Sequence, residues 1–359
     1  DTDRAVLGDD RLEAERPARP VDLDRRRRLI DRAGCSVVVS STELPMVTAL
    51  TAGEGDEPEP FRSDPSDEAY LLFTSGSTGE PKGVPITHRG LSDYLAFAAD
   101  AYVEPSRPPV APLFSALTFD LTITTLFVPL LTGGRLVVIG DDGVTGLAAV
   151  AADTDITWAK ATPSHLEILV RLLPPDHRLR SLIVGGEAFG SALARQILAF
   201  NPEARIFNEY GPTEAVVGCM IHQVDSRLEN DLTEVPIGRP APGVTLVVVD
   251  QYLQPVPPGV AGELLIHHRG LTTGYLGTGS ESDADTIPGP DAPSPFVEVG
   301  GRRFYRSGDL VRLHDQDRLI YLGRIDEQVK VGGRRLEPVE VEQALAEHPS
   351  VRRAAVRLW

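Results

Sequence analysis

The chain has 359 residues, of which 42% are hydrophobic and 24% are charged, and its formal net charge at pH 7 is -17. This length and balance predict a folded protein of about two to three lobes and exclude disordered and fibrous classes. Such a negative charge, with one short basic run at residues 25–28, excludes a nucleic-acid partner. No apolar run approaches the roughly 18 residues that cross a bilayer, and the first twenty residues are unlike a signal peptide. We therefore expect no membrane partner and a cytoplasmic location.

Cysteine and lysine are both rare. Cys35 and Cys219 are far apart and have no neighbours of metal-ligand type, so we expect buried thiols rather than a redox pair or a zinc site. Arginine replaces lysine everywhere except at Lys82, Lys160 and Lys330. Because the two side chains are not interchangeable, these three positions mark motifs to inspect.

The first two thirds of the chain predict an α/β architecture. Residues 1–45 contain a helix-like stretch and a short apolar strand, and are interpreted as the remnant of an N-terminal α/β lobe. Residues 46–220 are expected to form a second α/β lobe, because short apolar strands alternate with helical patterns there. The predicted elements are a strand at 69–73, a glycine-rich loop, a helix opening near Thr87, strands at 135–139, 181–184 and 205–207, and helices at 165–173 and 191–200.

The pattern changes after about residue 220. Residues 221–325 predict a β-rich lobe, with strands at 245–249, 263–267 and 318–322 separated by Gly and Pro turns. Residues 326–359 predict the start of a mobile C-terminal subdomain, with a strand at 328–331 and a helix opening at Pro338.

A loop rich in glycine and hydroxyl groups follows the strand at 69–73. The hydroxyls belong to Thr74, Ser75, Ser77 and Thr78, with Gly76 and Gly79 between them and Lys82 close behind. Backbone N–H groups, hydroxyls and one ammonium in this arrangement favour a polyphosphate cradle, so we expect ATP to bind here. A flexible linker is the alternative. The Walker pattern of P-loop kinases fails, because glycine rather than Ser or Thr follows Lys82.

Residues 74–83, TSGSTGEPKG, resemble the phosphate loop of adenylate-forming enzymes, and specifically that of adenylation domains of nonribosomal peptide synthetases. Four later motifs agree in order and spacing. They are NEYGPTE at 208–214, YRSGD at 305–309, GRIDEQVK at 323–330 and GGRRLE at 332–337.

The resemblance implies the adenylate-forming enzyme fold: a large core of α/β sheets, a β-rich lobe, the start of a small C-terminal lobe and a truncated N-terminal lobe. It implies a ligase that uses ATP and Mg²⁺. A carboxylate attacks the α-phosphate to give an acyl-adenylate and pyrophosphate, and the phosphopantetheine thiol of a carrier protein then takes the acyl group. The implied setting is secondary metabolism and antibiotic biosynthesis. A small MbtH-like activator protein is left open as a further partner.

The resemblance also assigns roles at the nucleotide site. Glu214 is implied to bind Mg²⁺, Tyr210 to stack on adenine, Asp309 to accept the ribose hydroxyls, Arg324 to contact the ribose, and Asp326 to be the hinge. The implied catalytic set is Thr74, Lys82, Glu214 and Asp309. The implied ATP contacts are Thr74, Ser75, Gly76, Ser77, Thr78, Gly79, Lys82, Gly186, Glu187, Ala188, Asn208, Tyr210, Gly211, Thr213, Asp309 and Arg324.

A substrate pocket follows from the same resemblance. Asp120 matches the residue that pairs with the substrate α-ammonium, which implies an α-amino acid. Lys160 can donate to a carbonyl oxygen and Glu209 can accept from an amide N–H, so a primary amide is expected and asparagine is favoured, with aspartate or a 3-substituted relative left open. The implied pocket residues are Asp120, Leu121, Thr124, Lys160, Ile183, Gly185, Glu209, Val217 and Gly218.

Two departures from the family pattern keep alternatives open. Members carry more N-terminal sequence and a catalytic lysine near the end of the C-terminal lobe, and Lys330 is not that lysine. We therefore expect a fragment, or a domain interrupted after Trp359, in which activity of the chain alone is uncertain. The alternatives are a fragment that binds ligands without turnover, and an acyl- or aryl-CoA ligase, which Asp120, Lys160 and Glu209 disfavour.

Overall fold

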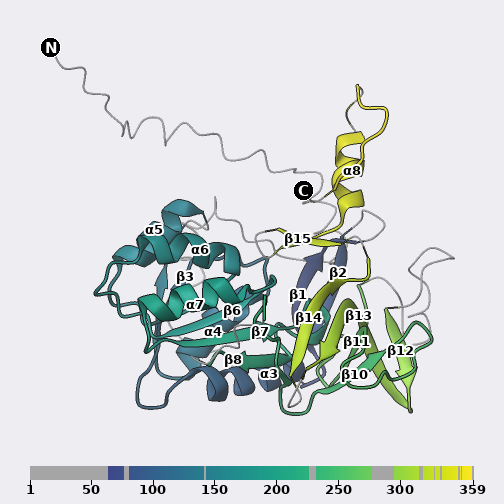
Figure 1. The fold of residues 1–359 in the computed structure, drawn as a ribbon, viewed down its shortest axis with the longest axis horizontal. Helices are drawn as coiled ribbons and strands as arrows, with labels where there is room; N and C mark the ends of the chain where they lie inside the picture. Colours follow the sequence, from purple (N-terminus) through teal and green to yellow (C-terminus); the bar gives the residue numbers. More distant parts are fainter. Residues whose placement is uncertain are drawn as a thin grey trace, which may run out of the picture. The chain divides into compact units, whose positions relative to one another are not determined.

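The computed structural model places the later five sixths of the chain in sheets and helices (Figure 1). The predicted N-terminal remnant and Cys35 lie outside the described residues, and so do Ser77, Thr78 and Gly79 of the glycine-rich loop. The described residues all belong to one compact unit, 62–359. They are 64–76, 81–140, 143–225, 232–276, 295–314, 318–326, 328–331, 334–346, 348 and 350–357.

The glycine-rich loop joins two antiparallel strands, β1 (Glu68–Thr74) and β2 (Lys82–Thr87). The predicted order of strand, loop and helix was wrong here, because β2 stands between the loop and the helix. The β-branched Val84 and Ile86 are fully buried in β2, which explains why this short segment is a strand. The helix α3 (His88–Tyr102) then begins as expected, with Thr87 as its N-cap accepting from the Gly90 amide at 3.2 Å.

A five-stranded sheet forms the centre of the α/β region. β5 (Trp158–Ala161), β6 (Ser181–Gly185) and β7 (Arg205–Tyr210) run parallel, and β8 (Met220–Gln223) and β9 (Arg239–Pro240) continue the sheet antiparallel. A parallel pair, β3 (Val110–Leu113) and β4 (Arg135–Val138), precedes it. The helices of this region are α4 (Leu121–Leu131), α5 (Val144–Ala152), α6 (Pro163–Leu172) and α7 (Ser191–Phe200).

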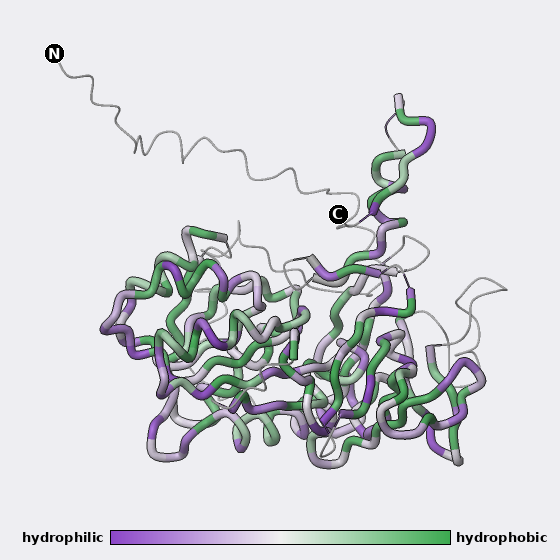
Figure 2. The backbone as a smooth tube through the Cα atoms, viewed as in Figure 1, coloured by the Kyte–Doolittle hydropathy of each residue, from purple (hydrophilic) through white to green (hydrophobic). Residues whose placement is uncertain are grey.

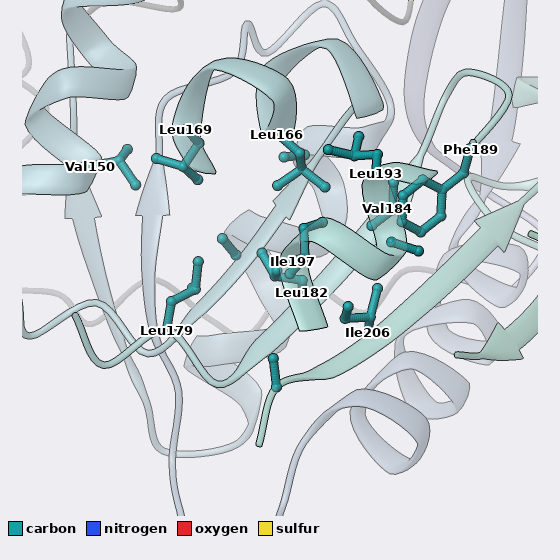
Figure 3. Packing of buried hydrophobic residues seen from close by; sticks show 14 of the residues in the cluster. Val150, Leu166, Leu169, Leu179, Leu182, Val184, Phe189, Leu193, Ile197 and Ile206 are labelled. Carbon is teal, nitrogen blue, oxygen red and sulfur yellow. The ribbon is translucent and has the colours of Figure 1, made fainter. Parts of the chain in front are cut away.

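Strand alternation sends buried side chains to both faces of this sheet. Leu182, Val184 and Ile206 pack with α5, α6 and α7 on one face (Figure 3). Ile183 and Phe207 pack with α3 and α4 on the other face. Since a strand turns every second residue to the same side, Lys160, which pairs with Ile183 in the register, faces α3 and α4 as well. The polar pocket described below lies on that face.

The β-rich region is an antiparallel sheet with the order β10–β11–β13–β12, and β14 pairs with β13. Its inner face packs on the end of the central sheet through Tyr210 and Met220. Both faces of this sheet bury hydrophobic side chains, because Leu264 and Ile266 of β11 pack in one cluster and Leu265 packs in another. The strands carry both hydrophobic and hydrophilic residues (Figure 2). The strands are β10 (Thr245–Val249), β11 (Ala261–His267), β12 (Phe296–Val299), β13 (Arg302–Leu313) and β14 (Leu319–Arg324).

The chain continues into a short hairpin of β15 (Val329–Val331) and β16 (Arg334–Leu336), followed by α8 (Pro338–Ala346). The expected opening of this helix at Pro338 is confirmed. The expected bounds of α7 and β10 are also those observed. Within the described residues, no helix has the length and apolarity that a bilayer crossing requires.

Candidate active site

A buried ion pair lies at the centre of the predicted substrate pocket. Lys160 of β5 and Glu209 of β7 are in direct contact, and their side chains are only 1% and 2% exposed. The Lys160 ammonium also donates to Thr124 Oγ1 at 2.7 Å and to the Tyr94 hydroxyl at 3.2 Å. The ammonium therefore has three protein acceptors, which matches its three N–H donors.

Two tyrosines from α3 hold the other oxygen of the Glu209 carboxylate. The Tyr94 hydroxyl donates to Glu209 Oε1 at 2.9 Å, and the Tyr102 hydroxyl donates to the same oxygen at 2.7 Å. Burial raises the pKa of both tyrosines well above the usual range, and the charge of Glu209 raises it further. Both hydroxyls therefore stay protonated and act as donors.

Gly218 leaves the space that the Glu209 side chain occupies. A Cβ atom at Gly218 would lie 2.4 Å from Glu209 Cδ, which no real side chain tolerates. The preceding residues Val216 and Val217 both have a φ of 60°, a left-handed conformation that β-branched residues rarely adopt. Such positions cost on the order of 1–3 kcal/mol each and persist where the surroundings fix them, often at functional sites. This strained turn brings Gly218 against Glu209.

Asp120 occupies the N-cap position of α4, and its side chain makes no capping hydrogen bond there. It is 9% exposed, and its Oδ2 accepts from Thr213 Oγ1 at 2.7 Å. Burial raises the pKa of Asp120, whereas the Thr213 hydroxyl and the charges of Lys160 and Lys330 lower it. A cationic group placed beside this carboxylate would favour its charged form, as an α-ammonium would. Thr213 was predicted to contact ATP, and here it supports Asp120.

The remaining predicted pocket residues gather around these groups. Leu121, Thr124 and Ile183 are 3% exposed or less, and Val217 is also buried. Gly185 pairs with Glu209 in the register of β6 and β7, and a Cβ there would lie 3.0 Å from the Glu209 carbonyl oxygen. The structure therefore brings the sequence-predicted set together on one face of the sheet.

A second pocket opens at the carboxyl ends of β6 and β7 beside Tyr210. About 460 Å³ of space outside the protein atoms lies there, part of it open to solvent. Asn208 donates to the carbonyl oxygens of Val235 and Pro236 at 3.1 and 2.9 Å and so fixes the opposite wall. The lining includes the predicted ATP contacts Gly186, Glu187, Ala188, Asn208, Tyr210 and Gly211, together with Tyr321 and Lys330.

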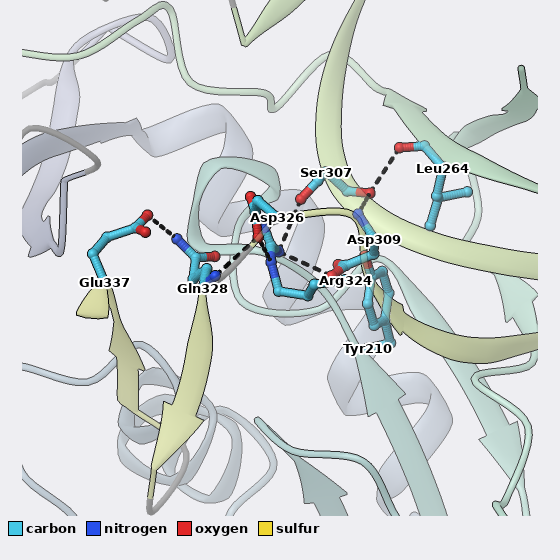
Figure 4. Close-up of polar contacts among 8 residues, drawn as sticks. All are labelled: Tyr210, Leu264, Ser307, Asp309, Arg324, Asp326, Gln328 and Glu337. Atoms are coloured by element: carbon cyan, nitrogen blue, oxygen red, sulfur yellow. Dashed lines mark hydrogen bonds and ion pairs between the residues drawn. The ribbon is translucent and has the colours of Figure 1, made fainter. Parts of the chain in front are cut away.

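Asp309 lies in β13 of the β-rich sheet and contacts Tyr210 of β7 (Figure 4). One carboxylate oxygen accepts from the Tyr210 hydroxyl and the other accepts from Arg324 Nη1 at 2.9 Å. The Asp309 amide is in turn fixed by Ser307 Oγ at 3.0 Å. Gly308 has a φ of 69°, and a Cβ there would lie 2.6 Å from Arg324 Nη2, so glycine leaves room for the guanidinium.

Arg324 connects Asp309 to the predicted hinge residue. Its Nε and Nη2 donate to the two oxygens of Asp326 at 2.6 Å each, and Asp326 Oδ1 also accepts from the Gln328 amide at 3.2 Å. Gln328 then contacts Glu337 at the end of the β15–β16 hairpin (Figure 4). A continuous polar chain thus runs from the nucleotide pocket to the C-terminal hairpin.

Glu214, the predicted metal ligand, is fully buried in a short 3₁₀ turn, Thr213–Ala215. Its Oε1 accepts from the Tyr275 hydroxyl at 2.7 Å. The Lys82 ammonium lies 5.3 Å from the centre of the Tyr275 ring, within cation–π range. Tyr275 therefore connects the lysine of the glycine-rich loop to the carboxylate.

The described part of the glycine-rich loop agrees with an anion site. Thr74 Oγ1 is buried and has no hydrogen-bond partner in the part of the chain that the structure describes. A buried hydroxyl without a partner is costly, so it marks a place where a ligand oxygen would be stabilised. Ser75 and Gly76 follow directly at the start of the loop.

Sequence reasoning missed Tyr94, Tyr102 and Tyr275. The first two belong to α3, which carries no family motif. Their hydroxyls were the available signal, since a buried tyrosine usually finds a hydrogen-bond partner. Only the packing of α3 on the sheet shows which partner that is.

A family model described as AMP-binding enzyme matches residues 5–276. Bacitracin synthase 3 of Bacillus licheniformis is 37% identical over 357 residues, covering 94% of this chain and 5% of the relative. Tyrocidine synthase 3 of Brevibacillus parabrevis is 40% identical over 296 residues, covering 82% of this chain and 4% of the relative. The chain thus spans a small part of the curated relatives it matches.

Solved structures agree with the fold. The structure of holo-PA1221, an NRPS protein containing adenylation and PCP domains bound to a vinylsulfonamide inhibitor, has a TM-score of 0.76 and 28% identity, covering 92% of this chain and 58% of that one. The Vibrio cholerae adenylation domain AlmE, in complex with glycyl-adenosine-5'-phosphate, has a TM-score of 0.78 and 24% identity, covering 94% of this chain and 70% of that one. The expected adenylate-forming fold, with its α/β core and β-rich sheet, is confirmed.

Proposed function

The chain belongs to the AMP-binding enzyme family, and we propose that it activates an α-amino acid as its aminoacyl-adenylate for transfer to a carrier protein in nonribosomal peptide synthesis. The names of the similar proteins support this proposal, since they are peptide synthases and an adenylation–PCP protein. Asp120 supports the substrate class, because a buried carboxylate at the pocket edge suits an ammonium group. An aryl or fatty acid would leave that carboxylate unpaired.

Asparagine is the side chain that the pocket supports best. The single observation that carries this choice is the closed contact between Lys160 and Glu209. The two charges cancel, so the wall of the pocket is polar and neutral. A neutral primary amide adds no charge beside such a wall, whereas a second carboxylate would be buried without a counter-charge, which is expensive. We place aspartate and 3-substituted relatives behind asparagine for that reason.

The nucleotide would occupy the pocket beside Tyr210. Asp309, held by Tyr210 and Arg324, retains lone pairs that can accept from ribose hydroxyls, because each carboxylate oxygen can accept more than one hydrogen bond. Thr74 and Lys82 would hold the phosphates where the glycine-rich loop begins and ends.

Glu214 fits a role in Mg²⁺ binding. No cluster of three or more His, Cys, Asp or Glu forms a metal cage among the described residues. Mg²⁺ does not require such a cage, since one or two carboxylates and phosphate oxygens complete its shell. When bound, Mg²⁺ would neutralise phosphate charge during attack. The chain's own contribution is to fix Glu214, through Tyr275, close to Lys82.

The test is amino-acid-dependent exchange of pyrophosphate into ATP, measured with asparagine, aspartate, 3-hydroxyasparagine, glutamine and leucine. We expect the highest kcat/KM with asparagine, by at least about tenfold over aspartate. A clear preference for aspartate would refute the asparagine assignment. Calorimetric binding of ATP and asparagine without exchange would instead indicate a binding-only module, and turnover of carboxylic acids with coenzyme A would indicate a CoA ligase.

A further inference from the structure

We propose that Tyr94 and Tyr102 of α3 are specificity-determining positioning residues, which hold the Glu209 carboxylate against Lys160 through two hydrogen bonds and thereby select a neutral amide over a carboxylate. The inference rests on the proposed function, because it concerns the same substrate pocket. Neither tyrosine lies in a motif of the nucleotide site or on the strands that carry Lys160 and Glu209.

The carboxylate of Glu209 is divided between two kinds of donor. One oxygen accepts from the Lys160 ammonium, and the other accepts from both tyrosine hydroxyls. Without the hydroxyls, Oε1 would be a buried, unsatisfied acceptor, and the carboxylate would lose two of the contacts that fix it against Lys160.

The position of the Glu209 carboxylate decides the charge that a substrate meets. While the carboxylate stays in contact with the ammonium, Lys160 is neutralised. If the carboxylate moves away, the Lys160 ammonium loses its counter-charge and attracts a substrate carboxylate. The two hydroxyls thus favour an amide over a carboxylate by keeping Glu209 in place.

The rings of the two tyrosines are held independently of their hydroxyls. Tyr94 and Tyr102 lie two turns apart on α3, with the fully buried Ala98 between them. The Tyr102 ring packs edge-on against Phe207 at 5.2 Å between centroids and against Phe97 at 5.9 Å. Tyr94 lies 6.5 Å from Phe97. Replacing either tyrosine with phenylalanine therefore removes the hydroxyl and keeps the packing.

The experiment compares kcat/KM for asparagine and aspartate in pyrophosphate exchange, using wild-type chain, Tyr94→Phe, Tyr102→Phe and the double variant. We expect the asparagine-to-aspartate ratio of kcat/KM to fall roughly tenfold in the double variant, and less in each single variant. The reason is that hydrogen bonds to charged groups contribute more free energy than those between neutral groups. Tyr305→Phe is the matched control, since Tyr305 is equally buried but lies in β13, and its ratio should equal that of wild type.

A Glu209→Gln background completes the cycle. Glutamine carries no charge to preserve, so adding the two phenylalanines there should change the ratio less than about twofold. An unchanged ratio in the double variant overturns the inference, and so does an equal fall in the Glu209→Gln background. If the tyrosines had only a structural role, kcat/KM would fall equally for both substrates and the ratio would stay unchanged. If the double variant does not fold, the asparagine-to-aspartate ratio of Tyr102→Phe alone tests the inference.

Failure of the proposed function is distinguishable, because it appears in the wild-type arm. If wild-type chain neither exchanges nor binds asparagine or aspartate by calorimetry, both the function and this inference are overturned. If wild type prefers asparagine and the tyrosine variants keep that preference, only this inference is overturned.

Discussion

The two ion-paired clusters of the candidate site use similar chemistry in different surroundings. Lys160 and Glu209 are 1% and 2% exposed, and the side chains that Lys160 contacts are themselves buried. Arg324 is 10% exposed and pairs with Asp309 at 5% and with Asp326 at 50%. Breaking a fully buried ion pair costs much free energy, whereas a pair that reaches solvent can separate at little cost. The first cluster is therefore held in one arrangement, whereas the second can exchange its partners.

The largest expected effect tests the dry pair. Lys160→Ala leaves Glu209 buried without a positive partner and should lower the free energy of unfolding by about 3–5 kcal/mol. Urea denaturation measures it. The double variant Lys160→Met with Glu209→Leu is the control, since it removes both charges at similar volume and should recover most of the stability but not the activation of asparagine. A loss below about 1 kcal/mol for Lys160→Ala would contradict a dry, essential pair.

Gly218→Ala should have the next largest effect on stability. The added Cβ would lie 2.4 Å from Glu209 Cδ, so the carboxylate or the strained turn must move. We expect a loss of about 1–3 kcal/mol in stability, as for overpacking, together with loss of asparagine-dependent exchange. Gly140→Ala is the matched control, because nothing lies within 4 Å of a Cβ at Gly140. Normal exchange by Gly218→Ala would show that the position of Glu209 is not critical.

Tyr275→Phe tests whether Glu214 depends on its buried partner in the same way as Glu209. Loss of the donor at 2.7 Å should raise the Mg²⁺ concentration for half-maximal exchange by about tenfold, since residues that orient metal ligands typically affect metal affinity by that amount. A Mg²⁺ titration measures it. Tyr252→Phe, with Tyr252 73% exposed, should behave as wild type. An unchanged Mg²⁺ requirement in Tyr275→Phe would separate Tyr275 from the metal site.

The smallest effect is expected at the partly exposed pair of Arg324 and Asp326. Asp326→Asn removes a charge whose side chain is half exposed, and Arg324 keeps its bond to Asp309. The free energy of unfolding should fall by less than about 1 kcal/mol, as for other exposed pairs. Urea denaturation beside Lys160→Ala gives a direct contrast. A loss comparable to that of Lys160→Ala would remove the distinction between the two clusters.

The sequence predicted several elements closely because their local signals agree. Ser191–Phe200 and Thr245–Val249 were expected with the bounds observed, since turn residues flank a clear periodic pattern in each. The strand β2 was missed because the lysine, glycine and proline at its start predict a turn, and its pairing with β1 depends on a contact across the loop. The four predicted domain boundaries stay predictions.

The sequence by itself determined the family motifs and the alternation of strands and helices, and it predicted which residues stand at the nucleotide and substrate positions. These follow from the order of residue types along the chain, which is local information. Only the tertiary structure decided that Lys160 and Glu209 neutralise each other rather than each facing the substrate separately, and that tyrosines from α3 complete the pair. The physical reason is burial: the partners are 49 to 115 residues apart in the chain, and packing of α3 on the sheet removes water that would otherwise satisfy them.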